Sequence, residues 1–308
     1  LRAARDMVTD LKINDADFEI LAGSLSNEHL VDLVLTIAFY CGVVRVLATL
    51  EIDNEPHYKE ALKNSPYRCN ECDVLGATVM TELTTLLTGL TFAEGPRWHN
   101  RKLWFSDFYA HEVITVDEEG KRVTIVKVPE QPSGLGWTPD NKLLIVSMRD
   151  QKLLRLEDNG LVEHADLSKF ANYWCNDCVV DAEGGAYVGN FGFNRHANEH
   201  PRGTTLIYVS PSGQTSVAAD DLWFPNGTVI TPDNKTLIIA ETRGKRLTAF
   251  DIGQNGKLSG RRVFAETKTM YPDGICLDKE GGVWVADPQN KEVIRVKEGG
   301  DVTNRIPL

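Results

Sequence analysis

The stretch Pro225-Asn226-Gly227-Thr228-Val229-Ile230 leads into the turn Thr231-Pro232-Asp233-Asn234 and then into the apolar run Leu237-Ile238-Ile239. A small oxygen-bearing side chain opens the first strand of this pattern, and a Pro-Asp-Asn turn separates it from the second. Four other segments repeat the arrangement, so that five positions correspond: Glu94, Ser133, Asn176, Asn226 and Asp273. Each opening is followed four residues later by an apolar side chain: Trp98, Trp137, Val180, Ile230 or Leu277.

These openings are 39, 43, 50 and 47 residues apart. A repeat of about 40–50 residues with several strands in each unit is typical of a β-propeller. Equivalent inner strands of a propeller line one central channel, so we expect the five opening side chains to converge on its axis. One glutamate, one aspartate, two asparagines and one serine offer oxygen ligands without His or Cys. Such a set suits a hard cation, with Ca²⁺ as the first expectation and Zn²⁺, Mg²⁺ or Mn²⁺ as alternatives.

Composition limits the classes of partner. The 308 residues carry 33 basic and 44 acidic side chains, a formal charge of −11, so there is no basic stripe for nucleic acid. The longest apolar stretch, Leu30–Leu50, is interrupted by polar residues, which argues against a membrane span. Six cysteines in a chain of this length do not indicate a disulfide scaffold, and we expect a cytoplasmic protein.

The chain divides into three parts. Residues 1–62 predict a small α-helical segment, since apolar residues recur at helical spacing along Leu30–Leu50. Residues 63–82 predict a linker, and residues 83–308 hold the repeats. The apolar face of this helix must be buried against a partner. We expect the helix to dock on the propeller, on another copy of the chain, or on residues that precede Leu1. The absence of an initiator Met indicates a processed chain or a fragment.

Several motifs together resemble one family, the regucalcin/gluconolactonase/luciferin-regenerating-enzyme family of six-bladed propellers. The resemblance covers about residues 83–308 and rests on Glu94-Gly95-Pro96-Arg97-Trp98, Trp104-Phe105-Ser106-Asp107, Asn176-Asp177 with Asp181, Phe224-Pro225-Asn226-Gly227, and Pro272-Asp273-Gly274 through Asp278. It implies a divalent metal on the axis and lactone hydrolysis. By motif, Glu94, Asn226 and Asp273 would be metal ligands, and Asn176 would bind the metal or the substrate. Trp174 stands where the family has a substrate-binding Arg, so the resemblance does not carry sugar-lactone specificity.

The resemblance breaks at the sixth blade. That family builds it from a strand before the Glu-Gly-Pro motif together with strands at the C-terminus. Here residues 84–90 could supply the first strand, but no later strands follow the fifth repeat. We therefore expect a mostly β, six-bladed propeller with an incomplete sixth blade. Its open edge, like the N-terminal helices, is a candidate surface for homo-oligomers.

The front part is similar to the C-terminal helices of a carboxymuconolactone-decarboxylase-like domain. The similar segments are Ile13-Asn14-Asp15, Leu30 through Val34, and Tyr40 through Arg45. That family's catalytic residues precede these helices, so we assign the front part no chemistry.

The expected chemistry is metal-assisted opening of a lactone ring, with Asp273 as both ligand and general base. A second column of side chains ends the next strands, and we expect it lower in or beside the channel: Asp107, Met148, Asn190, Glu241 and Asp287. We expect Asn176, Asn190, Arg149 and Ser133 to bind substrate. The alternative is that the second column only makes structural hydrogen bonds.

Other interpretations stay open at this point. Asn226-Gly227 and Asp273-Gly274 could be turn dipeptides alone. The two Cys-x-x-Cys runs, 69–72 and 175–178, lie too far apart for a zinc ribbon, and His196 and His200 fall in an insertion that could cover the channel mouth. The rival functions are a non-enzymatic calcium-binding propeller and an esterase or phosphotriesterase that uses the same ion.

Overall fold

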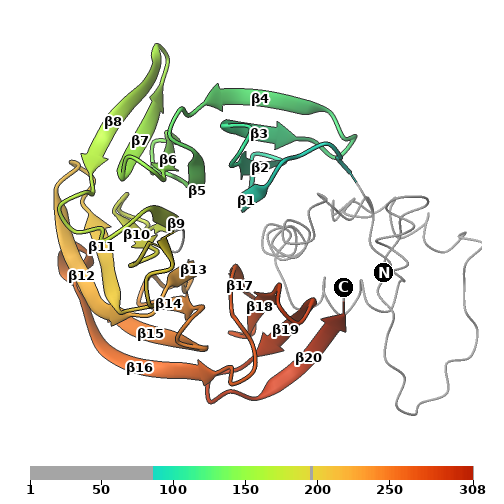
Figure 1. Ribbon diagram of the computed structural model, residues 1–308, viewed down its shortest axis with the longest axis vertical. Helices are drawn as coiled ribbons and strands as arrows, with labels where there is room; N and C mark the ends of the chain where they lie inside the picture. Colours follow the sequence, from blue (N-terminus) through green and yellow to red (C-terminus); the bar gives the residue numbers. More distant parts are fainter. Residues whose placement is uncertain (1–85, 195–196, 308) are drawn as a thin grey trace, which may run out of the picture.

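The computed structural model describes residues 86–194 and 197–307. These residues form twenty β-strands in five antiparallel sheets of four consecutive strands, together with the short 3-10 helix η2 (Gln254–Gly256). In Figure 1 the sheets stand as blades around a common centre, with the first strand of each sheet innermost and the fourth outermost. The prediction of a mostly β propeller is therefore confirmed.

The bounds of the blades follow the repeats. The first blade contains β1 (Ala93–His99), β2 (Lys102–Asp107), β3 (Glu112–Val116) and β4 (Arg122–Lys127). The second contains β5 (Pro132–Trp137), β6 (Leu143–Ser147), β7 (Lys152–Glu157) and β8 (Gly160–Asp166). The third contains β9 (Cys175–Val180), β10 (Ala186–Asn190), β11 (Thr204–Val209) and β12 (Thr215–Leu222). The fourth contains β13 (Pro225–Ile230), β14 (Thr236–Glu241), β15 (Arg246–Ile252) and β16 (Leu258–Glu266). The fifth contains β17 (Ile275–Leu277), β18 (Val283–Asp287), β19 (Glu292–Val296) and β20 (Val302–Pro307).

The described residues contain five blades, whereas the sequence resemblance implied six. Inner strands contact one another in the order β1, β5, β9, β13 and β17, and the first and fifth blades are the two ends of the arc that the described strands form in Figure 1. A strand was expected over residues 84–90. The structure describes residues 86–90 of this stretch, and they form no strand, so the prediction is wrong for these residues. The predicted helical segment 1–62 and linker 63–82 lie outside the described residues.

The turns between inner strands form where the sequence predicted them. In the second to fifth blades the left-handed position of this turn is occupied by Asn or Gly, which tolerate positive φ: Asn141 (64°), Gly184 (90°), Asn234 (57°) and Gly281 (76°). The amide of Asn141 donates to Thr138 O at 2.8 Å, and that of Asn234 donates to Thr231 O at 2.8 Å. These tight turns fix the register of each inner hairpin, and the register sets the height of every opening residue in the channel.

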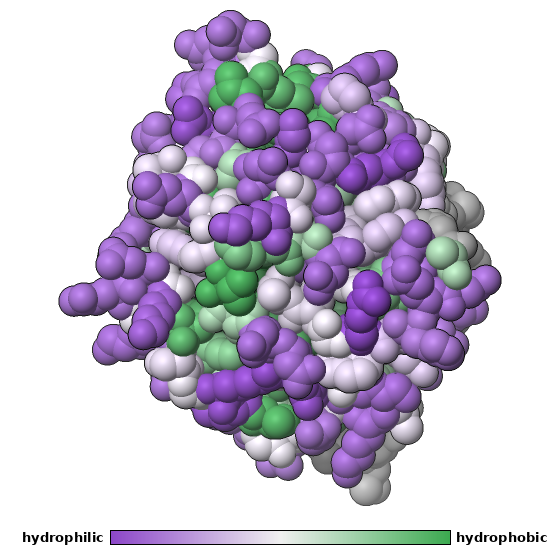
Figure 2. Space-filling view, turned by 60° about the vertical axis from the view of Figure 1, so that its left-hand side comes forward, coloured by the Kyte–Doolittle hydropathy of each residue, from purple (hydrophilic) through white to green (hydrophobic). Residues whose placement is uncertain are grey.

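The core lies between blades, where the faces of adjacent sheets pack together. Between the second and third blades, Leu144 and Val146 of β6 belong to one buried cluster with Val188 of β10 and Ile207 of β11. The outermost strands are the most exposed; β4, for example, consists of exposed and half-buried residues only. Figure 2 accordingly shows a predominantly hydrophilic face on which hydrophobic residues form separate patches. Among the described residues no helix has the length and apolarity that a membrane crossing requires.

Candidate functional site

The five opening residues lie at one end of neighbouring inner strands. Gly227 N donates to Asp273 O at 3.0 Å, which joins the fourth and fifth blades at their openings. Asn176 Nδ2 donates to Pro225 O at 3.5 Å, which joins the third and fourth. A Cβ placed on Gly95 would lie 2.8 Å from Ser133 O, so the first and second openings are also in contact. The structure thus brings the repeat openings together in chain order.

Glycine after the opening residue makes this close approach possible. A Cβ on Gly134 would lie 2.4 Å from Cys178 N, and one on Gly227 would lie 2.5 Å from Ile275 N. Backbone atoms cannot move aside as a flexible side chain can, so larger residues would push the inner strands apart. The Ser-Gly and Asn-Gly pairs are therefore packing requirements of the channel as well as turn signals.

Asn226 is 6% exposed, and a hydrogen-bond chain orients its amide. Thr242 Oγ1 donates to Pro272 O at 2.7 Å, so this oxygen is left to accept from Asn226 Nδ2 at 3.1 Å. No donor in the described part of the chain is hydrogen-bonded to Asn226 Oδ1. This arrangement presents the amide oxygen, the atom a cation requires, as the open group of Asn226.

Asn176 is arranged in a similar way at 5% exposure. Its Nδ2 is directed to Pro225 O, and its Oδ1 has no hydrogen-bond donor in residues 86–194 and 197–307. The next residue, Asp177, accepts from Arg97 Nη2 at 3.0 Å and from Cys178 N at 2.8 Å. Arg97 belongs to β1, so this half-buried ion pair ties the first blade to the third just behind the openings.

The two acidic openings lie in the first and fifth blades. Glu94 is half-buried in β1, and its Oε2 accepts from Gly95 N at 3.2 Å. Asp273 is 7% exposed, and its backbone is held by Ala286 O and Gly227 N. Residues 86–194 and 197–307 hold no group of three or more His, Cys, Asp or Glu side chains that could bind a metal ion. A cation at this end of the channel therefore depends on the oxygens of Asn176 and Asn226 as well as on the two carboxylates.

Ser133 lies at the opening of β5 and is 2% exposed. Its carbonyl accepts from Ser106 Oγ at 2.6 Å, a contact between the first and second blades. Because it sits between the Glu94 and Asn176 openings, its hydroxyl remains a candidate for substrate binding.

The second column lies beside the openings, one strand farther from the axis, and accepts hydrogen bonds from the backbone of nearby loop residues. Asp107 accepts from Phe92 N at 2.9 Å, Glu241 from Trp223 N at 2.8 Å, and Asp287 from Gln289 N at 3.1 Å. Asn190 is fully engaged: its Nδ2 donates to Thr205 O at 2.8 Å, and its Oδ1 accepts from Gly192 N at 3.0 Å and from Thr204 Oγ1 at 2.6 Å. These contacts favour the structural alternative for Asn190 over the predicted substrate role.

Arg149 follows β6 at the same end of the channel, and its side chain is 47% exposed. Its guanidinium carbon lies 5.5 Å from the ring centroid of Trp174, and Nε lies 3.9 Å from Glu130 Oε2. Trp174 immediately precedes β9, so the stacking brings Arg149 to the rim beside the Asn176 opening.

Sequence reasoning missed a set of aromatic residues at this rim. The residue two positions before the opening is aromatic in four repeats, and we call these residues the aromatic collar: Phe92, Trp174, Phe224 and Tyr271. In the remaining repeat this position is Gln131. The register of the repeats carried the signal, because positions that correspond in a propeller lie at the same height around the axis.

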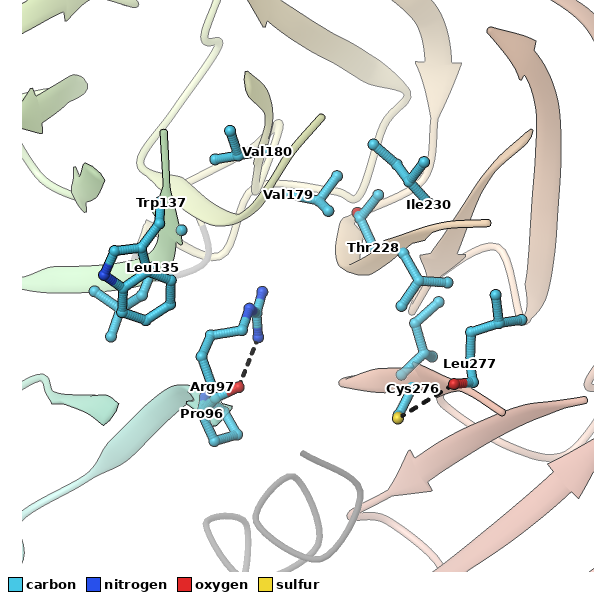
Figure 3. A pocket seen from close by; sticks show the side chains of 13 residues that line it. Pro96, Arg97, Leu135, Trp137, Val179, Val180, Thr228, Ile230, Cys276 and Leu277 are labelled. Carbon is cyan, nitrogen blue, oxygen red and sulfur yellow. Dashed lines mark hydrogen bonds between the residues drawn. The ribbon is translucent and has the colours of Figure 1, made fainter. Parts of the chain in front are cut away.

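A cavity of about 290 Å³ occupies the other end of the channel. Figure 3 shows Arg97 pointing into it from β1, opposite apolar residues of the other inner strands. Its lining comes from the later parts of the inner strands: Pro96, Arg97, Leu135, Gly136, Trp137, Val179, Val180, Thr228, Val229, Ile230, Ile275, Cys276 and Leu277. The cavity is therefore separate from the opening residues.

The cysteines of the third blade are buried in β9. Burial raises the pKa of the Cys175 thiol far above its ordinary value and that of Cys178 to about 12, so both are protonated near neutral pH. Of the predicted insertion, His200 is exposed and His196 lies outside the described residues. Cys69 and Cys72 also lie outside them.

Residues 92–308 match the family described as SMP-30/Gluconolactonase/LRE-like region. The match covers most of the chain, and the protein belongs to this family of propellers. Its relatives include a 6-deoxy-6-sulfogluconolactonase from Pseudomonas putida, 26% identical over 225 residues, or 70% of this chain and 75% of that protein. They also include a regucalcin from Gallus gallus, 32% identical over 210 residues, or 66% of this chain and 70% of that protein.

A solved gluconolactonase from Xanthomonas campestris superimposes with a TM-score of 0.62 at 25% identity, covering 75% of this chain and 80% of that structure. A luciferin-regenerating enzyme gives a TM-score of 0.64 at 18% identity, covering 72% of this chain and 78% of that one, which bears on the fold alone. Known lactonases therefore share both sequence and fold with this chain.

Proposed function

We propose that the protein hydrolyses a lactone with the help of a divalent cation, Ca²⁺ by preference, held by Glu94, Asn176, Asn226 and Asp273. The observation that carries the proposal is the chain from Pro272 through Thr242 to Asn226, which leaves an amide oxygen as the open group of a buried residue. Two carboxylates and two amide oxygens form a donor set suited to a hard cation. The sugar lactonases among the relatives support the same reaction class.

When bound, such a cation polarises a lactone carbonyl and lowers the pKa of water. Asp273 takes the proton of the water molecule that attacks the carbonyl carbon, and returns it to the ring oxygen as the carbon–oxygen bond breaks. Asn176 and Ser133 lie between the acidic openings and hold the substrate ring in place. Four protein ligands leave open positions on an ion that takes six to eight, which gives water and substrate room to bind.

A non-enzymatic calcium-binding propeller is the second candidate. Several relatives are regucalcins, and one solved structure, from Agrobacterium tumefaciens, is described as a calcium-binding protein. That structure is 23% identical with a TM-score of 0.63, covering 72% of this chain and 76% of that one, so its likeness bears on the fold alone. The lactonase and the calcium-binding propeller would use the same metal ligands, and only the lactonase would turn over a substrate.

The test is hydrolysis of a panel of lactones, simple esters and phosphotriesters, followed by pH-stat after chelation and after addition of Ca²⁺, Zn²⁺, Mg²⁺ or Mn²⁺. We expect the metal to restore lactone turnover, and Asp273→Asn to lower kcat by about 100-fold or more, the usual contribution of a general base. Asp140→Asn is the matched control, because Asp140 is an exposed turn residue away from the openings. Calcium binding by calorimetry without turnover of any compound would favour the binding propeller.

A further inference from the structure

The four residues of the aromatic collar lie at the same end of the inner strands as the proposed ligands. Phe92, Trp174 and Phe224 each come directly before an inner strand, and Tyr271 lies two residues before Asp273. Since the openings touch one another in chain order, the collar residues are brought to one rim. A molecule that reaches Asn176 or Asn226 from this end passes them.

Neighbouring side chains hold the collar rings in fixed positions. Phe92 stacks on Phe108 with ring centroids 5.2 Å apart, and Trp174 stacks on Tyr173 at 5.1 Å. Phe224 stacks on Phe191 at 4.8 Å with the ring planes within 10°. Cations stack on two of the rings: Arg149 on Trp174, and Lys245, whose Nζ lies 4.5 Å from the centroid of Tyr271. Rigid aromatic groups cost little conformational entropy when they bind a ligand, so this rim is preorganised.

Phe224 adopts a conformation that a bulky residue seldom does. Its φ is +59°, in the left-handed region, which costs about 1–2 kcal/mol for a residue with a side chain. Its carbonyl accepts from Thr242 N at 3.0 Å, and Thr242 is also the residue that orients Asn226. The strained backbone therefore joins a collar ring to a proposed metal ligand, and strain of this kind is concentrated at functional sites.

Part of the polar capacity at this rim is used within the protein. Asn190 Oδ1 accepts two hydrogen bonds within the protein, and the Nδ2 atoms of Asn190, Asn176 and Asn226 each donate one to a protein acceptor. A hydroxyl that loses water without gaining a partner costs about 1–3 kcal/mol. A flat apolar group has no such cost, and gains contact with the collar rings.

We infer that the collar makes the protein selective for lactones that carry an aromatic ring, in preference to polyhydroxylated sugar lactones. The inference rests on the proposed lactonase function, whose reaction centre it shares, and it assigns the collar rings to specificity. Trp174 and Phe224 precede Asn176 and Asn226, the two proposed amide ligands, which lie in adjacent blades, and these two rings determine the preference.

The test compares γ-phenyl-γ-butyrolactone with γ-butyrolactone, which share the same reacting ring, and adds glucono-1,5-lactone as the sugar lactone. We expect kcat/KM to be at least about 10-fold higher for the phenyl compound, within the range that apolar pockets achieve. Trp174→Leu and Phe224→Gly should each reduce this ratio about 5-fold or more. Glycine suits Phe224 because it accepts the same positive φ without the ring.

Trp137→Leu is the matched control, since Trp137 stacks on His99 at the other end of the channel and should not change the ratio. Thermal melting of each variant verifies its folding. An equal fall for both butyrolactones in the collar variants, or a wild-type preference for glucono-1,5-lactone, would overturn the inference while the lactonase function stood.

Calorimetry with 4-hydroxy-4-phenylbutanoate, the hydrolysis product of the phenyl compound, gives a reading that does not depend on turnover. We expect the wild type to bind it and Trp174→Leu to bind it about 5-fold more weakly, with Trp137→Leu unchanged. Such binding without any lactone turnover would overturn the lactonase function and leave aromatic recognition by the collar supported. Neither turnover nor binding would overturn both.

Discussion

Thr242 decides which atom of Asn226 is available at the channel opening. An asparagine amide can rotate by 180° at small cost, and its NH₂ end would repel a cation where its oxygen would bind one. Because Thr242 Oγ1 donates its proton to Pro272 O, it can only accept from Asn226. The hydroxyl group of Thr242, in the turn after β14, thus determines which amide atom of Asn226, 16 positions earlier, is available to a cation.

Replacement of Thr242 by valine keeps the shape of the side chain and removes this control. We expect Thr242→Val to weaken Ca²⁺ binding about 10-fold, the lower end of the effect of removing a group that orients a ligand. Isothermal calorimetry measures the change. Thr231→Val is the control, because the Thr231 hydroxyl makes similar hydrogen bonds in a turn of the same blade at the other end of the inner strand. An unchanged Kd in Thr242→Val would show that the hydroxyl does not orient the ligand.

Among the strands, β8 carries an ionisable group in an unfavourable environment. His164 is partly buried, its Nδ1 lies 3.2 Å from Arg155 Nη1 of β7, and its buried Nε2 has no hydrogen-bond partner in the described structure. Loss of hydration lowers the pKa of His164 below 6.5, and the positive charge of Arg155 lowers it further. The folded protein therefore keeps this imidazole neutral where the unfolded chain protonates it.

This difference predicts how stability depends on pH. The unfolded chain binds more protons than the folded one between the unfolded pKa of 6.5 and the lower folded pKa, so the free energy of unfolding falls as pH decreases through that window. Below the folded pKa the penalty is complete, and above 6.5 it is absent. His164→Gln should flatten the pH dependence between about pH 7 and pH 5, measured by urea denaturation. Exposed His200→Gln should leave it unchanged, and equal slopes for wild type and His164→Gln would contradict the prediction.

At the scale of the whole molecule, the proposed ligands come from four blades. Glu94 belongs to β1, Asn176 to β9, Asn226 to β13, and Asp273 precedes β17. The first and fifth blades are the two ends of the arc that the described strands form in Figure 1, so a cation held by all four residues would join these two ends. Binding of this kind stabilises the folded ring over any state in which the blades separate.

Calcium should therefore raise the stability of the whole propeller. At a free Ca²⁺ concentration 100 times Kd, the free energy of unfolding should rise by about 2.7 kcal/mol if the unfolded chain binds no metal. Denaturation by guanidinium chloride with and without chelator measures the difference. Asp273→Asn should lose most of it, whereas Asp140→Asn should keep it. A wild type whose midpoint does not change with Ca²⁺ would argue against an ion that joins the blades.

The sequence was informative wherever the structure depends on neighbours along the chain. Strand alternation and turn residues such as Asn141 and Asn234 indicated the hairpins, and the repeat register placed the openings at one end of the inner strands. The same register contains the aromatic collar, whose residues recur two positions before four of the five openings. The expected strand over residues 84–90 was not found in its described part, since apolar and β-branched residues alone do not make a strand without a partner.

By itself, then, the sequence determined the propeller class, the order of its blades and the residues at each opening, because these follow from local periodicity and spacing. The tertiary structure alone decided that Thr242 orients Asn226. It also decided that Asn190 forms hydrogen bonds with Thr204 and Thr205. The stacking of Arg149 on Trp174 likewise depends on tertiary packing. The tertiary structure also brought Arg97 to Asp177, 80 residues away. Such contacts join residues that only the packing of blade on blade brings together, and no short-range pattern in the chain encodes them.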